Sequence, residues 1–428
     1  MEILIIGAGP AGLTAALSLH QAGFRPRVYE AVSRPAPLGV GINLLPHAVR
    51  ELAELGLLDD LRRLGVETNE LVYLSKHGKP IWREARGLAA GYKWPQISIH
   101  RGELQMLLLR KTVERLGEEN VLLGHTLADL ETSDQGVTAH FVQRATGESL
   151  GARKADVLIG ADGIHSAVRR KFYPNEGPPN FSGATLWRAT VEATPFLGGR
   201  AMVWAGHSRQ KLVAYPIRHD PATGKTLINW ICELRGDSTQ TPPKEDWNKP
   251  GNKADFLPAF ASWRFPEIDT PALVEATEQV FEFPMVDRDP LPRWTFGRAT
   301  LMGDAAHPMF PIGSNGATQG LLDARVFSYH LATAGSIDEA LARYENERRT
   351  ATTRIVMTNR ANGPDQVMEL VEQRAPHPDD DLDARVPFEE RKAIADEYKR
   401  ITGFDPKVLN ERMSYTVLPG SRAGGDRS

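Results

Sequence analysis

Cysteine is almost missing from this sequence. Cys232 is the one cysteine among 428 residues, so no disulfide can form within the chain. This excludes the disulfide-stapled class of small secreted folds and favours a reducing compartment. Apolar runs are short as well, and none approaches the roughly 20 residues that a membrane-spanning helix needs. Because the first predicted strand begins at residue 2, we expect no targeting peptide and predict a cytoplasmic protein.

Neither sign of charge dominates. The chain has 51 Lys and Arg residues against 54 Asp and Glu residues, a net charge of −3. Bulk attraction to nucleic acid or to an anionic membrane is therefore not expected. No group of residues has the spacing of a metal site, and no G-x-S-x-G motif suggests a hydrolase. The length allows two or three domains with sizeable cores.

Three glycines, in contrast, stand close together near the start of the chain. The continuous apolar run over residues 3–6 predicts a parallel strand covered on both faces. It leads into a G-x-G-x-x-G motif and then a helix to about residue 21. In such a motif Gly7 permits a tight turn, Gly9 lets the backbone approach a pyrophosphate, and Gly12 lets the helix pack closely on the strand.

An acid ends the next predicted strand, over residues 27–29. Its carboxylate, on Glu30, can accept hydrogen bonds from an adenosine ribose and would repel a 2′-phosphate. Strand, glycine turn, helix, strand and acid together predict a dinucleotide-binding fold. The motif alone does not distinguish FAD from NAD.

Two later apolar strands also run into an acid, at Asp162 and Asp304. Because the carboxyl ends of parallel strands meet at one edge of a sheet, these acids and Glu30 could converge on one elongated ligand. A glycine-containing loop over residues 311–316 follows the last strand and leads into a helix to about residue 333.

Several other segments have a readable pattern. Residues 185–191, 211–217 and 226–233 predict an antiparallel second sheet, the natural wall of a substrate pocket. Residues 121–130 and 137–142 predict two more strands, and 71–74 with 80–83 a hairpin. Amphipathic helices are predicted over 338–362 and 388–401, and residues 419–428 are predicted to be disordered.

Three ordered motifs resemble the class A flavoprotein aromatic hydroxylases, the family typified by p-hydroxybenzoate hydroxylase. They lie at residues 7–12 with Glu30, at 156–169, and at 303–308. Within the family the chain is similar to the pyocyanin-forming phenazine hydroxylase type. That similarity rests on residues 38–43, 98–108, 285–292 and 302–307. The resemblance covers roughly residues 1–360.

The resemblance implies one bound FAD that is reduced by NADH or NADPH and reacts with O2. An aromatic or N-heteroaromatic small molecule would then be hydroxylated through a C4a-hydroperoxyflavin. The implied α/β fold is a Rossmann-type FAD-binding domain interleaved with an antiparallel-sheet substrate domain, followed by a helical C-terminal region. We expect residues 1–180 and 285–335 in the FAD domain, with a hairpin inserted near 70–100. Residues 181–284 would form the substrate domain, and 336–428 the C-terminal helices and a flexible tail.

The resemblance also implies which residues contact the cofactor. Arg101 would lie near the pyrophosphate, and Leu127 would contact the adenine side through its backbone. The isoalloxazine would lie against residues 313–317, where many members have a Gly-Gln-Gly loop that this chain lacks. The full predicted set is Gly7, Gly9, Ala11, Gly12, Glu30, Gly41, Arg101, Leu127, Asp162, Asp304, Gly313, Asn315, Gly316 and Ala317.

For the substrate, four residues are candidates. Trp187, Arg188 and Tyr215 lie on the predicted second sheet, and Pro311 lies beside the glycine loop. They could form an aromatic pocket with Arg188 for an acidic group, although a core or surface role is the alternative for each. No side chain is assigned as a catalytic base, because the chemistry would occur on the flavin.

Other functions remain open at this point. The same scaffold could perform epoxidation, N-oxygenation or Baeyer–Villiger oxidation. An NAD-linked reductase that uses the first domain alone is a different class, and a non-catalytic flavin-binding protein is a third. No second G-x-G-x-x-G follows a later strand, which argues against a separate nicotinamide domain.

Overall fold

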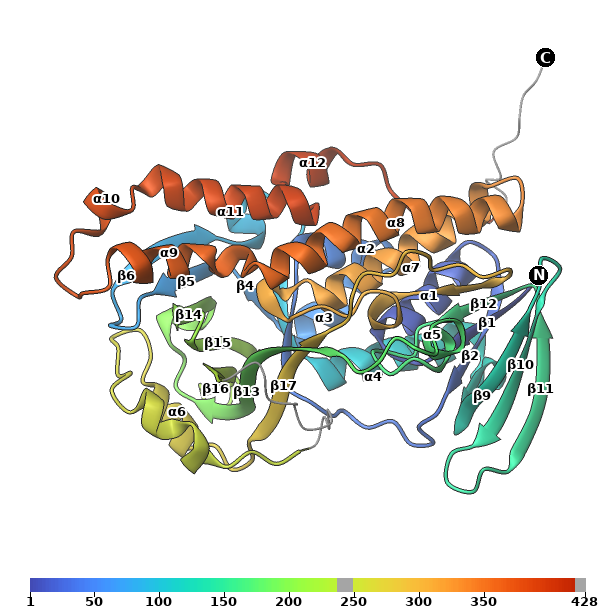
Figure 1. The fold of residues 1–428 in the computed structure, drawn as a ribbon, viewed down its shortest axis with the longest axis horizontal. Helices are drawn as coiled ribbons and strands as arrows, with labels where there is room; N and C mark the ends of the chain where they lie inside the picture. Colours follow the sequence, from blue (N-terminus) through green and yellow to red (C-terminus); the bar gives the residue numbers. More distant parts are fainter. Residues whose placement is uncertain (237–248, 420–428) are drawn as a thin grey trace, which may run out of the picture.

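A computed structural model describes residues 1–236 and 249–419 of the chain. It contains a five-stranded sheet, a seven-stranded sheet and two three-stranded sheets. In Figure 1 the five-stranded sheet lies toward the right and the seven-stranded sheet toward the left, with helices of the C-terminal third above them. The predicted α/β class, the second sheet and the C-terminal helices are confirmed. The disorder predicted for the tail falls almost entirely on residues 420–428, outside the described ranges.

The five-stranded sheet is parallel throughout, in the order β18-β12-β1-β2-β8. Ile3 and Ile5 are completely buried, and Leu4 is almost completely buried. Because β1 is covered on both faces, its sequence is continuously apolar. Helix α1 (Pro10–Gln21) contacts both α4 (Arg101–Leu116) and α7 (Gly316–Thr333). The strands are β1 (Glu2–Ile6), β2 (Arg25–Glu30), β8 (Val121–Leu123), β12 (Val157–Gly160) and β18 (Ala299–Leu301).

An antiparallel meander connects β8 to β12. It consists of β9 (His125–Thr132), β10 (Val137–Gln143) and β11 (Ser149–Ala155). The single strand predicted over residues 121–130 is wrong in one respect, because the chain breaks at Gly124, where φ is +74°. That glycine lets the chain leave the parallel sheet and enter the meander.

The seven-stranded sheet has the order β17-β13-β16-β15-β14-β5-β6. Strands β14 and β5 pair in parallel, and the other neighbours pair antiparallel. The hairpin expected near residues 70–100 is therefore the far edge of this sheet. Strand β14 was not predicted, because its residues are buried without alternation. The strands are β5 (Glu70–Leu74), β6 (Pro80–Ala85), β13 (Asn180–Ala193), β14 (Ala201–His207), β15 (Gln210–His219), β16 (Thr226–Arg235) and β17 (Phe281–Asp287).

A small antiparallel sheet lies beside β15. It consists of β3 (Gly41–Leu44), β7 (Gln96–His100) and β4 (Val66–Thr68), and β7 and β4 both contact β15. This sheet brings the segment after Glu30 against the seven-stranded sheet. The remaining helices of the first 300 residues are α2 (Pro46–Glu54), α3 (Leu58–Leu64), α5 (Ala167–Phe172) and α6 (Thr270–Glu275).

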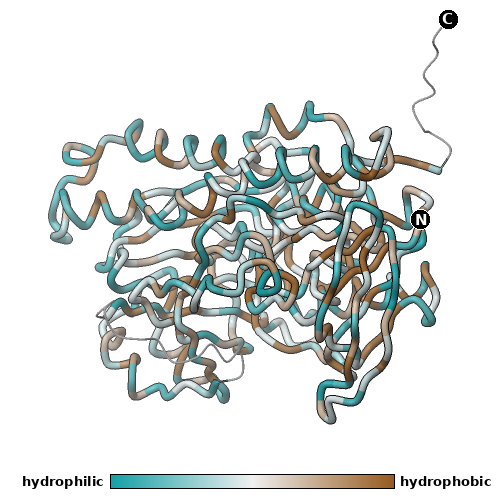
Figure 2. Tube along the Cα trace, turned by 45° about the vertical axis from the view of Figure 1, so that its right-hand side comes forward, coloured by the Kyte–Doolittle hydropathy of each residue, from teal (hydrophilic) through white to brown (hydrophobic). Residues whose placement is uncertain are grey.

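The C-terminal helices cover the seven-stranded sheet and α7. Val367 and Met368 of α9 share a buried cluster with Tyr73 and Trp204 of the sheet. In Figure 2 hydrophobic segments gather on the inner strands, while hydrophilic colour recurs along the outer helices. Within the described ranges, no helix combines the length and the apolar character needed to cross a bilayer. The helices are α8 (Ile337–Arg360), α9 (Gln366–Arg374), α10 (Leu382–Arg385), α11 (Phe388–Thr402) and α12 (Pro406–Glu411).

Candidate active site

The glycine turn between β1 and α1 has one open position. A Cβ on Gly7 would lie 2.5 Å from the carbonyl oxygen of Ala161, and a Cβ on Gly12 would overlap the carbonyl oxygen of Gly7. A Cβ on Gly9 would meet nothing within 4 Å. Gly7 and Gly12 are thus required by packing within the protein, whereas Gly9 borders free space at the N-terminus of α1. This arrangement fits a phosphate group that approaches the backbone of Gly9.

Glu30 stands beside that turn, at the end of β2. Its carboxylate accepts hydrogen bonds from the backbone N–H of Ala8 and of Val32, both at 2.8 Å. The acid is therefore fixed next to the glycine motif, where a ribose bound to the same diphosphate would lie. Strand β9, which carries the buried Leu127, contacts β2.

The turn after β18 brings Asp304 to the same edge of the sheet. Gly303 packs against α1, since a Cβ on it would lie 3.0 Å from that of Ala11. Its N–H donates to the carboxylate of Asp323 at 2.9 Å. The Asp304 side chain is exposed, and it forms no hydrogen bond or ion pair within residues 1–236 and 249–419. A rigid turn therefore presents one free carboxylate toward the open edge.

A buried ionic network supports this turn from below. Asp323 accepts from Arg348 Nε at 2.7 Å, and its other oxygen lies 2.5 Å from His307 Nε2. Burial alone raises the pKa of Asp323, but the charges of His307 and Arg348 outweigh burial and lower that pKa to about 2. The network keeps the carboxylate ionised and the turn fixed. His307 therefore has a structural partner in Asp323.

Asp162 is placed differently from the other two acids. It follows β12, but its carboxylate accepts from the Ser166 hydroxyl at 2.5 Å and from the Ala167 N–H at 2.7 Å. Burial raises its pKa. The side chain thus holds the start of α5, and a direct role toward the cofactor stays a prediction.

The 312–316 loop lies just before α7. Gly313 and Ser314 have φ values of +71° and +60°, so the loop turns sharply. Asn315 is completely buried, and its amide donates to the Gly313 carbonyl at 3.2 Å. Gly316 and Ala317 form the first turn of α7, whose free N–H groups and positive dipole end suit a negatively charged ligand atom.

Gly41 connects the nucleotide side to the second sheet. Its N–H donates to the Asn229 side-chain carbonyl at 2.8 Å. A Cβ on Gly41 would lie 2.8 Å from atoms of Asn229, Ile217 and Tyr215. Close packing therefore requires glycine here. The Asn229 Nδ2 group is completely buried and forms no hydrogen bond within the described chain.

One face of the seven-stranded sheet carries two of the predicted substrate residues. Strand pairing places Tyr215 opposite Asn229 and Arg188 opposite Ile231, all on the same face. The Arg188 guanidinium lies 3.6 Å over the ring centroid of Phe283. Burial, and then the positive charge of Arg101, lower the pKa of Arg188 to about 9. Burial also raises the pKa of Tyr215.

Trp187 lies apart from the other two predicted substrate residues of the sheet, in the core role that the sequence left open for it. Side chains alternate along β13, so Trp187 points to the face opposite Arg188. There its ring stacks on Phe256 with centroids 5.1 Å apart, in a buried cluster with Trp230. Pro311, in contrast, is exposed directly before the 312–316 loop. Its neighbours Phe310 and Ile312 share a cluster with Phe283.

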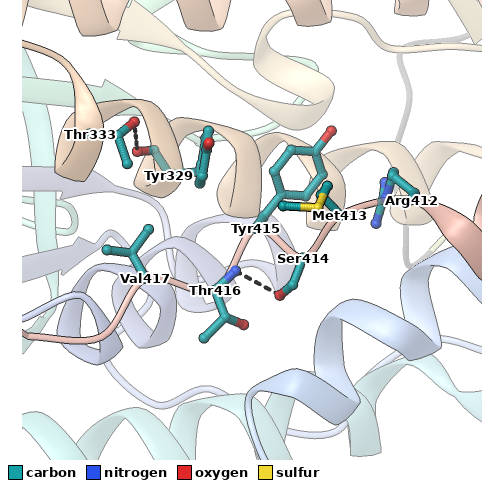
Figure 3. A pocket seen from close by; sticks show the side chains of 8 residues that line it. All are labelled: Tyr329, Thr333, Arg412, Met413, Ser414, Tyr415, Thr416 and Val417. Atoms are coloured by element: carbon teal, nitrogen blue, oxygen red, sulfur yellow. Dashed lines mark hydrogen bonds between the residues drawn. The ribbon is translucent and has the colours of Figure 1, made fainter. Parts of the chain in front are cut away.

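Of two cavities in the described structure, one lies away from these residues and the other lies beside them. One, of about 530 Å³, separates the far end of α7 from the C-terminal segment 412–417. Figure 3 shows that Tyr329 and Thr333 line it from α7 and that the other six residues come from the segment. The second, of about 360 Å³, includes Phe310 and Ile312 and therefore adjoins the 312–316 loop.

Sequence reasoning missed two residues of this region. Asn229 lies on a predicted strand, and the alternation of side chains places it on the same face of the sheet as Ile231. No nearby sequence pattern, however, indicates that Asn229 contacts Gly41. Tyr398 of α11 contacts the 312–316 loop from a part of the chain outside the resemblance. No signal in the sequence indicates that contact.

Comparisons with known proteins find similar sequences and similar folds. The family described as "FAD binding domain" matches residues 1–359. A Lysobacter antibioticus protein named phenazine 1,6-dicarboxylic acid hydroxylase PhzS is 45% identical over 362 residues, covering 84% of this chain and 89% of that protein. The 3-amino-4-hydroxybenzoate 2-monooxygenase PtmB3 of Streptomyces platensis is 32% identical over 425 residues, covering 96% and 98%. A solved salicylate hydroxylase substrate complex has the same fold, with a TM-score of 0.74 at 22% identity, covering 98% of this chain and 99% of that one.

Proposed function

The chain belongs to the FAD-binding-domain family, and from this premise we propose that its substrate is a planar ring acid of the phenazine carboxylic acid class. The protein is an FAD-dependent monooxygenase that acts with NAD(P)H and O2 on a small aromatic molecule. This agrees with the function that the resemblance implied. The relatives named above are monooxygenases, so the reductase and the non-catalytic alternatives have no support among them.

The half-buried Arg188 carries the proposal for the substrate. Its guanidinium is stacked on Phe283 and shares a sheet face with Tyr215 and Asn229. Burial and Arg101 both disfavour its positive charge, so an anionic group brought next to it would be stabilised. The aromatic side chains beside it suit a flat ring. The PhzS relative is named for a ring that carries such carboxylates.

Support for the cofactor placement comes from the protein's own geometry. The diphosphate would approach the open backbone at Gly9, with Glu30 on the adenosine ribose. Arg101 would neutralise part of the phosphate charge, and Asp304 would receive hydrogen bonds from the ribityl or ribose hydroxyls. Gly313 to Ala317 would lie against the isoalloxazine, and the backbone of Leu127 would lie on the adenine side.

Bound FAD, reduced by the nicotinamide, supplies the oxygen-transfer chemistry. The protein would position the substrate against the flavin ring, stabilise negative charge on that ring and exclude water from the site. The N-terminus of α7 would stabilise negative charge on the pyrimidine end of the ring. Tyr215 and Phe283 are buried on the substrate face and keep water from the ring. Arg188 would fix the orientation of the acid and thereby select the carbon that is oxidised.

We also propose how the chain divides into domains. Residues 1–180 and 285–335 would form the FAD domain, except that the hairpin β5–β6 and the end of β17 (residues 285–287) belong with residues 181–284 in the substrate sheet. Residues 336–428 form the C-terminal region. A cytoplasmic location is part of this proposal, because reduced nicotinamide is available there and the single cysteine is buried.

Steady-state kinetics with one arginine variant test the proposal. Arg188→Met is expected to raise KM for phenazine-1-carboxylic acid about 100-fold, the size expected when a charge-assisted hydrogen bond is lost. KM for phenazine or 1-hydroxyphenazine should change by less than about threefold. Arg218→Met on β15 is the control, since Arg218 is exposed on the same sheet. NMR of the product distinguishes ring hydroxylation from N-oxygenation. An equal change for carboxylated and uncarboxylated rings would refute the role of Arg188.

A further inference from the structure

Helix α11 reaches the 312–316 loop through one tyrosine. The Tyr398 side chain is buried, and its hydroxyl accepts a hydrogen bond from Asn315 Nδ2 at 2.9 Å. The hydroxyl proton can be donated to Asn359 Oδ1 at 3.0 Å, at the end of α8. One oxygen atom thus connects α11, α8 and the loop.

The same hydroxyl also determines the shape of the loop. A Cβ on Gly313 would overlap the Tyr398 oxygen, and its next neighbours would be Cζ and Cε1 of the same ring at 2.5 and 2.7 Å. The Ile312 carbonyl lies 3.3 Å from the hydroxyl. The tyrosine therefore fills the space under Gly313, and the loop rests on it.

From Asn315 a chain of buried hydrogen bonds leads to the turn that carries Asp304. Gln319 donates to Asn315 Oδ1 at 3.2 Å and accepts from Arg348 at 2.6 Å. Arg348 also donates to Asp323, which accepts from the Gly303 N–H. Because these groups are buried, a lost partner leaves an unsatisfied polar atom rather than a hydrated one.

We propose that Tyr398 is a positioning residue for the flavin ring and that α11 is thereby a functional part of the cofactor site. This rests on the proposed placement of the isoalloxazine against residues 313–317. Tyr398 lies beyond residue 359, where the family match ends. Tyr398 would act by holding the 312–316 loop and not by touching the flavin. A displacement of α11 would therefore shift the loop and, through it, the flavin ring.

Tyr398→Phe tests this with little change in volume, and Tyr92→Phe is the matched control. Tyr92 is buried in the same cluster as Tyr398, but its hydroxyl donates to the Phe404 carbonyl at 2.6 Å and does not contact the loop. Hydrogen–deuterium exchange is measured on both apoproteins. In Tyr398→Phe, the amides of residues 312–318 should exchange about tenfold faster than in wild type, because one buried hydrogen bond is lost. In Tyr92→Phe, these amides should exchange at the wild-type rate.

Spectroscopy of the FAD-loaded proteins follows. Tyr398→Phe should shift the visible flavin absorption and circular dichroism bands, weaken FAD binding about tenfold, and lower the product formed per NAD(P)H oxidised. Tyr92→Phe should leave all three unchanged even where its melting temperature falls equally. Unchanged exchange in Tyr398→Phe overturns the proposal while the cofactor placement stands. Faster exchange with unchanged flavin spectra instead refutes the placement of the ring at this loop, and with it the proposal.

A second variant covers the case in which Tyr398→Phe does not fold. Asn359→Ser removes the nearer of the two acceptors of the tyrosine hydroxyl, together with the Asn359 donor to the Phe310 carbonyl, and keeps the ring under Gly313. It should give the same spectral shift with a smaller, roughly threefold, loss of FAD affinity. Wild-type spectra and affinity in this variant overturn the proposal.

Discussion

Gly9 offers the sharpest test of the cofactor site, because a methyl group there should harm binding without harming the fold. Gly9 has φ −77° and ψ 176°, which alanine adopts without strain, and its added Cβ would meet no protein atom within 4 Å. The apoprotein should therefore be as stable as wild type or gain about 0.4–1 kcal/mol from a less flexible unfolded chain. The methyl group would stand where the diphosphate approaches, and overpacking costs about 1–3 kcal/mol. FAD affinity should fall about 5- to 150-fold.

Titration of apoprotein with FAD, followed by quenching of flavin fluorescence, gives the affinity, and thermal unfolding of the apoprotein gives its stability. Gly12→Ala is the matched control with the opposite profile. Its Cβ would overlap the Gly7 carbonyl, so the apoprotein itself should lose about 1–3 kcal/mol or more. Wild-type FAD affinity in folded Gly9→Ala would refute the placement of the diphosphate at this turn. Unfolding of Gly9→Ala without FAD would refute the claim that the space beside it is open.

Three further predictions concern acids and an aromatic residue. Asp304→Asn should weaken FAD binding about tenfold with unchanged apoprotein melting, because the carboxylate is exposed; an equal loss of melting temperature would contradict this. The folded pKa of Asp323 is about 2, below its ordinary value of 3.8, so its contribution is complete above pH 3.8 and is lost as pH falls toward 2. Asp323→Asn should accordingly lower the free energy of unfolding by about 2 kcal/mol at pH 7 but by much less at pH 2, measured by urea unfolding. Trp187→Phe should lower stability by about 1–3 kcal/mol and leave KM for the ring acid unchanged; a large rise in KM would place Trp187 at the substrate after all.

The nucleotide half of the fold was predictable because its signals are local. A continuous apolar run marks each buried parallel strand, and the acid that follows marks its carboxyl end. Glu30 and Asp304 are brought to one edge of the sheet for this reason. Asp162 follows the same pattern, yet its side chain caps α5, because Ser166 and Ala167 place two donors within reach a few residues later.

The substrate half was less predictable, because the pairing of its strands and the face to which each side chain points depend on residues far apart in the sequence. Trp187 and Arg188 are neighbours in sequence and lie on opposite faces of β13, and the sequence does not say which face meets the cofactor. Residues 201–206 of β14 are all buried, so this strand lacks the alternation of a half-exposed strand, and no acid or glycine motif follows it as it follows β12 and β18. Tyr398 reaches Asn315 across 83 residues, a contact that no spacing rule contains.

A crystal structure of the protein with FAD and phenazine-1-carboxylic acid tests the central claim most directly. We expect the adenosine ribose on Glu30, the diphosphate over Gly9 and the isoalloxazine against residues 313–317, with the carboxylate of the ring acid on Arg188. An isoalloxazine bound away from Gly313, or an adenosine bound away from Glu30, would contradict the account.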